Sequence, residues 1–83
     1  MGDSPSTVPA VVIHAPVIPP RVRHETIFAV FEALPAGHTA LLVNDHDPKP
    51  LIYQLESEQP GVFAIEYVER GPERFAIHVT RKA

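Results

Sequence analysis

Residues 39–48 read TALLVNDHDP, and this stretch decides the fold because it joins an apolar strand to a polar, chain-breaking turn. Thr39 to Val43 contains residues typical of strands, and the asparagine and aspartate that follow are poor continuations of one. Asp47 precedes a proline and is therefore disfavoured in helical backbone, whereas Pro48 suits a turn or a first helical position. We therefore expect the chain to leave a strand near Asn44 and to enter a helix near Pro50.

Outward from this turn, the spacing of apolar residues changes between two periods along the chain. Short apolar runs bounded by proline or glycine predict strands at residues 10–15 and 38–43. Helical spacing predicts one helix at 21–34, opened by Pro19 and Pro20 and ended by Gly37, and a second at 51–58. Alternation of apolar residues on both sides of Gly71 and Pro72 predicts a closing hairpin of two strands.

The register of that hairpin follows from its alternation. If the apolar residues of both strands face one core, the loop must contain an odd number of residues, which fits either 71–73 or 70–72. The first choice places Glu66 opposite His78 on the outer face, as a favourable cross-strand pair.

The predicted element order is β-α-β-α-β-β, an α+β fold. A strand-helix-strand unit within one sheet is parallel and crosses right-handed, and the hairpin adds antiparallel strands. Two helices on one face of a mixed four-stranded sheet then form a two-layer α/β sandwich. We expect ten residues to be mostly buried in its core: Ile27, Phe28, Phe31, Leu34, Leu42, Leu55, Phe63, Ile65, Phe75 and Ile77.

Length and composition limit the classes of protein to consider. Eighty-three residues suit one domain, with a polar, proline-containing tail at 1–9 expected to be disordered and a folded part at 10–83. The net charge of -3 gives no electrostatic footprint for nucleic acid. The absence of cysteine excludes disulfides, thiolate metal sites and thiol catalysis. Neither a membrane-length apolar run nor a signal peptide is present, so we expect a cytoplasmic monomer.

Several segments of the chain resemble a bacterial family of unknown function, DUF2249, which is distantly similar to the TusA/SirA-like sulfur carriers. They are residues 19–24, 34–37 and 42–51, and the Asn-Asp-His-Asp-Pro segment at 44–48 is the most specific. The resemblance covers about residues 12–81 and implies a TusA-like two-layer fold without supplying an activity. Family members occur alone or joined to hemerythrin-like or other redox-associated domains, which implies a partner protein of that kind and a link to metal or nitrogen-oxide metabolism.

The chain departs from the sequence pattern of the sulfur carriers and, at one position, from that of the DUF2249 family. The sulfur carriers place a cysteine before a proline at the first helix, but Ile18 precedes Pro19 here, so persulfide transfer is ruled out on chemistry. His14 stands where the DUF2249 family usually shows an acid. It would be a third ligand of a metal site or, as we expect, an exposed histidine at the sheet edge.

Topology brings two histidines together. His24 begins the crossover helix and His46 follows the strand to which that helix leads, so both belong to the carboxyl edge of the sheet, where ligands are often bound. Two imidazoles with Asp45 or Asp47 would suit a divalent transition metal. In the alternative, His24 only pins the turn at 44–48, and at least one of the two acids caps the second helix.

The first helix also begins with two arginines. Arg21 and Arg23 are candidates for binding an anion at the helix start, where free N–H groups point, although a solvated first turn is the simpler interpretation. The other histidines, His38 and His78, and both tyrosines, Tyr53 and Tyr67, are expected to be structural or solvated.

Three functional classes remain after this reading. No serine, histidine and acid stand at a recognisable spacing, and two layers of this size form only a shallow pocket. We therefore rank first a small non-catalytic binding or accessory module, with a metal or a partner protein as its ligand. A protein-protein interaction domain with purely structural histidines is the alternative, and a small enzyme comes last.

Overall fold

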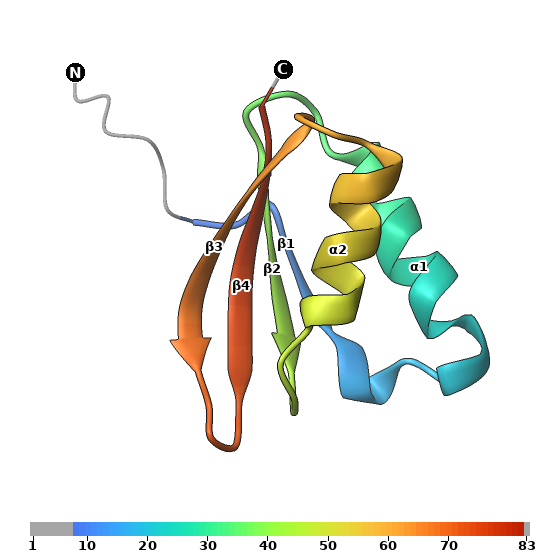
Figure 1. The fold of residues 1–83 in the computed structure, drawn as a ribbon, viewed down its shortest axis with the longest axis vertical. Coiled ribbons are helices and arrows are strands. Elements are labelled where there is room, and N and C mark those ends of the chain that lie inside the picture. Colours follow the sequence, from blue (N-terminus) through green and yellow to red (C-terminus); the bar gives the residue numbers. More distant parts are fainter. Residues whose placement is uncertain (1–7, 83) are drawn as a thin grey trace.

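The computed structural model describes residues 8–82, and their four strands and two helices form a two-layer α+β sandwich (Figure 1). The elements in chain order are β1 (Val11–His14), the 3-10 helix η1 (Ala15–Val17), α1 (Pro20–Ala33), β2 (Thr39–Asn44), α2 (Lys49–Glu58), β3 (Phe63–Arg70) and β4 (Phe75–Arg81). Both helices cover the same face of the sheet, and the other face has no second layer (Figure 1). The predicted order of strands and helices is confirmed, and η1 is the addition.

The sheet is mixed, with the strand order β1-β2-β4-β3. β1 pairs with β2 in parallel, and β4 pairs antiparallel with both β2 and β3. The pairing extends before β1, because the Ala10 N–H donates to the Thr39 carbonyl at 2.7 Å. Residues 1–7 of the tail expected at 1–9 lie outside the described residues, and Val8 and Pro9 lead into this pairing.

The second helix begins at Lys49 rather than Leu51, and the predicted carboxylate cap is wrong. Pro48 occupies the N-cap position, and no side chain caps the helix. The two acids have other partners: Asp45 pairs with the neighbouring His46, and Asp47 accepts a hydrogen bond from a tyrosine of β3. The local capping preference therefore yields to contacts that these carboxylates make elsewhere.

The hairpin has the predicted central register and a different turn. Glu66 stands opposite His78, as expected, but the loop contains the four residues 71–74 rather than three. A bulge at Val68 shifts the register by one residue, so an even loop still lets both apolar sets face one core. Gly71 has a φ of +79° and lies under the Phe75 ring, where an added Cβ would come within 2.7 Å of Cζ.

The core lies between the helices and the covered face of the sheet. Phe31 is fully buried there, with its ring centroid 6.3 Å from that of Phe28 and 6.2 Å from that of Phe63. Eight of the ten residues expected in the core are buried. The exceptions, Ile65 and Phe75, are only partly buried, because Ile65 lies on the edge strand β3 and Phe75 lies beside the hairpin loop.

Candidate functional site

Both helices begin at the edge of the sheet where β1 and β2 end, and a hollow of about 370 Å³ lies there. Figure 1 shows this edge at the bottom of the molecule, with the first turns of α1 and α2 beside it. We call the hollow the helix-start pocket. Its polar lining residues are Arg23, His24, Asn44, His46 and Gln54. Its apolar lining residues are Pro20, Ile27, Pro48, Pro50 and Leu51.

The two histidines that topology brings to this edge both line the helix-start pocket. His24 stacks on Phe28 one helical turn later, with ring centroids 4.4 Å apart and planes inclined by 23°. His46 Nδ1 donates to the Asp45 carboxylate at 2.8 Å, and both side chains are exposed. This hydrogen bond lowers the pKa of Asp45 and leaves Nε2 of His46 free for a ligand.

The two acids of the expected metal site do not line the pocket. Asp47 accepts a hydrogen bond from the Tyr67 hydroxyl, which ties the 44–48 turn to β3. Asp45 is directed to His46. Within residues 8–82, no three histidine or acidic side chains are placed to hold one metal ion. The structure thus gathers two of the four expected ligands around one pocket.

Of the two arginines at the start of the first helix, only one lines the pocket. Arg23 lines the pocket, and its guanidinium donates to the Ile18 carbonyl from Nε at 3.1 Å and from Nη2 at 2.9 Å. This carbonyl orients the guanidinium without neutralising it, and Arg23 forms no ion pair within residues 8–82. Arg21 is exposed and does not line the pocket.

Asn44 is a polar lining residue to which the sequence analysis assigned no role, as is Gln54. It is the one buried polar residue among those described, 7% exposed, and its Oδ1 accepts from the Asp45 N–H at 2.8 Å. Its Nδ2 donates to no other described group. Every fully buried side-chain nitrogen or oxygen in residues 8–82 has a partner, so Nδ2 keeps contact with solvent, and the pocket supplies that contact. The two-residue alternation Ala40, Leu42, Asn44 was the signal that places this side chain on the covered face.

The helix starts add partial positive charge to the same place. Neither α1 nor α2 has a side-chain cap or an acidic residue in its first turn. The hydrogen-bond ladder of α2 begins with the Ile52 N–H donating to the Pro48 carbonyl at 3.0 Å, so the N–H groups of Lys49 and Leu51 precede it. Free N–H groups and the helix dipole at such ends favour anions.

A family model described as an uncharacterized conserved protein, DUF2249, matches residues 12–81. The chain belongs to the DUF2249 family. No curated protein and no solved structure matches it at a significant level. Membership confirms the resemblance drawn from the sequence and supplies no activity, so the functional argument depends on the pocket.

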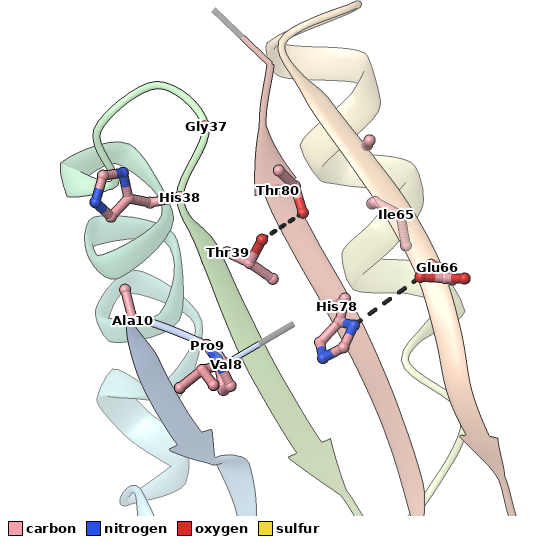
Figure 2. Close-up of a pocket in the computed structure, with 11 residues that line it drawn as sticks. Val8, Pro9, Ala10, Gly37, His38, Thr39, Ile65, Glu66, His78 and Thr80 are labelled. Atoms are coloured by element: carbon pink, nitrogen blue, oxygen red, sulfur yellow. Dashed lines mark hydrogen bonds and ion pairs between the residues drawn. The ribbon is translucent and has the colours of Figure 1, made fainter. Parts of the chain in front are cut away.

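A second hollow, of about 740 Å³, lies on the uncovered face of the sheet in this DUF2249 domain (Figure 2). Figure 2 shows that its polar groups face one another: Thr39 and Thr80 join their hydroxyls at 2.7 Å, and His78 lies 4.0 Å from the Glu66 carboxylate. His38, at the rim, is 3.3 Å from the Ala36 carbonyl. Although this hollow is larger, its polar groups already have partners, so the helix-start pocket is the better candidate site.

Two further observations complete the comparison with the sequence. His14 is exposed at the end of β1 and lines neither hollow. Neither helix in residues 8–82 has the length and apolar character needed to span a bilayer.

Proposed function

We propose that this DUF2249 domain is a small non-catalytic binding module that holds an anion in the helix-start pocket. The observation that carries the proposal is the Asn44 side chain, which is buried, bonded through its oxygen only, and has an unpaired N–H₂ group at the pocket. This donor is in contact with solvent, so an anion in the pocket would replace water at Nδ2 with a charge-assisted hydrogen bond.

The charges around the pocket favour an anion. Arg23 keeps its positive charge unpaired, and two uncapped helix starts contribute partial positive charge. His24 and His46 add positive charge when they are protonated. The pKa of Asp45 is lowered chiefly by its hydrogen bond to His46 and more weakly by attraction to Arg23, but this carboxylate does not line the pocket.

The lining also fits binding better than catalysis. It contains no serine, threonine or carboxylate, and therefore no nucleophile assisted by an acid or base in the arrangement that hydrolytic sites use. We accordingly place the domain among binding or accessory modules, working as a cytoplasmic monomer.

A divalent transition metal is the second candidate ligand, and the shared position of the His24 and His46 imidazoles is the observation in its favour. Two imidazoles would leave further coordination positions to water, because Asp47 is bonded to Tyr67. Under this alternative the partner would be a hemerythrin-like or other redox protein, an idea that depends on the family resemblance alone.

The dependence of affinity on pH separates the two ligands. An anion binds more tightly as the pH falls through the range in which imidazoles protonate, whereas a metal requires neutral imidazoles and binds less tightly. We would titrate the domain with sulfate, whose charge is constant over this range, and with zinc by calorimetry at mildly acidic and mildly alkaline pH. The charged or titratable groups at the site are Arg23 and His24 from α1, and Asp45 and His46 from the turn.

The matched variants are His46→Ala at the pocket and His78→Ala on the uncovered face. We expect sulfate binding that strengthens in acid, weakens in His46→Ala and is unchanged in His78→Ala. Asn44→Asp should abolish it, because a carboxylate replaces the donor. Zinc binding that strengthens with pH and disappears in His46→Ala, without sulfate binding, would replace the anion proposal by the metal one.

A further inference from the structure

The helix-start pocket has an apolar wall that an inorganic anion would not use. Five of its ten lining residues are apolar. Ile27 is only 1% exposed, so its side chain forms part of the pocket floor and is continuous with the core. Three of the five are prolines, whose restricted backbone makes this wall rigid before any ligand arrives.

The volume of the helix-start pocket also favours a ligand with an apolar part. A hollow of about 370 Å³ corresponds to roughly a dozen waters at about 30 Å³ each, and falls at the small end of ligand pockets. A bare anion seated at Asn44 would leave much of this space to water against Leu51 and Pro50, two lining residues with accessible apolar surface. A ligand with an apolar part would displace that water and gain from burying its own apolar surface.

We infer that the ligand is a small amphipathic carboxylic acid, with its carboxylate at Asn44 and the helix starts and a hydrocarbon part of a few carbons against Leu51 and Pro50. This inference rests on the proposed anion site and adds the chemical class of the ligand. The carboxylate accepts from Asn44 Nδ2 and from the His46 ring when that is protonated. The hydrocarbon part supplies selectivity by length, because each buried methylene tightens binding about fourfold.

The test is a series of acids that share one head group. Acetate, butanoate and hexanoate are titrated into the full chain at mildly acidic pH, followed by amide and side-chain chemical shifts in NMR. The expected result is a dissociation constant that falls about fourfold per added methylene until the hollow is filled, with shifts centred on Leu51 and Asn44. 1-Hexanol, which has the tail without the charge, should bind far more weakly than hexanoate.

Two neighbouring residues give a matched pair of variants. Leu51 lines the pocket, whereas Ile52 is also partly buried but does not line it. Leu51→Ala should weaken hexanoate by a larger factor than acetate, and Ile52→Ala should change neither. Because the ligand series is measured on the natural chain, the inference stays testable even if a variant unfolds.

The anion site and the amphipathic ligand can be refuted separately. Equal binding of acetate and hexanoate at the pocket overturns the amphipathic ligand and leaves the anion site standing. Equal binding of 1-hexanol and hexanoate overturns the anion site instead, and with it the carboxylic acid. Shifts centred on the uncovered face at Val12 and Leu41, or no binding by any member, overturn both.

Discussion

Replacing Tyr67 with phenylalanine should loosen the turn that forms one side of the helix-start pocket. The Tyr67 hydroxyl donates to the Asp47 carboxylate across 20 residues of sequence, and Arg70 lies over the same ring at 4.0 Å. A hydrogen bond to a charged group contributes about 1.5–3 kcal/mol, and the partial exposure of both residues favours the lower end. We therefore expect Tyr67→Phe to lower the free energy of unfolding by about 1–2 kcal/mol at neutral pH.

The same contact gives the effect a pH dependence of known sign. Burial, together with the hydrogen bond to Asp47, raises the pKa of Tyr67 from its ordinary value of 10.0 to about 12. Because the folded-state pKa is raised, the stabilisation is complete below about pH 10 and is lost as the pH rises through about 12. The difference in stability between the natural chain and Tyr67→Phe should shrink over that window.

Denaturant unfolding from neutral to alkaline pH measures this difference, and ultraviolet absorbance follows tyrosinate formation. Tyr53→Phe is the matched control, since Tyr53 is 68% exposed and makes no hydrogen bond among the described residues. Tyr67→Phe should remove the late ionisation step, and Tyr53→Phe should keep it. Equal unfolding midpoints for both variants and the natural chain at neutral pH would refute the reasoning.

Three further outcomes follow from the packing and the charges. Phe31→Ala should cost about 3–5 kcal/mol in denaturant unfolding, and an unchanged midpoint would show that the core is misassigned. Gly71→Ala should destabilise more than Gly61→Ala: both have φ near +80°, but only at Gly71 does the new Cβ meet an aromatic ring; equal losses would contradict this. His46→Ala should raise the pKa of Asp45 in a carboxyl NMR titration, and an unmoved titration would exclude their hydrogen bond as its cause.

The spacing of apolar residues along the sequence predicted most of the fold. Runs of strand-forming residues and helical stripes were enough to place the four strands and both α-helices, but not η1, because burial on one face dictates those patterns. The hairpin turn was mispredicted because a β-bulge at Val68 changes the parity of the loop, and nothing in the alternation of Phe63, Ile65 and Tyr67 announces it. An argument from the odd or even length of a hairpin loop holds only when the two strands pair without a bulge.

The site was only partly accessible from the sequence. Topology placed His24 and His46 at one edge, because that follows from the order of the elements. The Asp47 carboxylate accepts its hydrogen bond from a tyrosine 20 residues away, and local capping rules cannot anticipate such a distant partner. Asn44 looked like a strand terminator, and its burial depends on how the two helix starts and β2 meet.

The most direct measurement is a chemical-shift map of the domain titrated with inorganic phosphate at mildly acidic pH. The account predicts saturable shifts of the Asn44 side-chain amide and of the Lys49 and Leu51 backbone amides. Asn44 and Leu51 line the helix-start pocket, and Lys49 lies between two lining prolines at the start of α2. The amides of His78 and Thr80 on the uncovered face should not move. Shifts confined to those two residues, or none at all, would contradict an anion site at the helix starts.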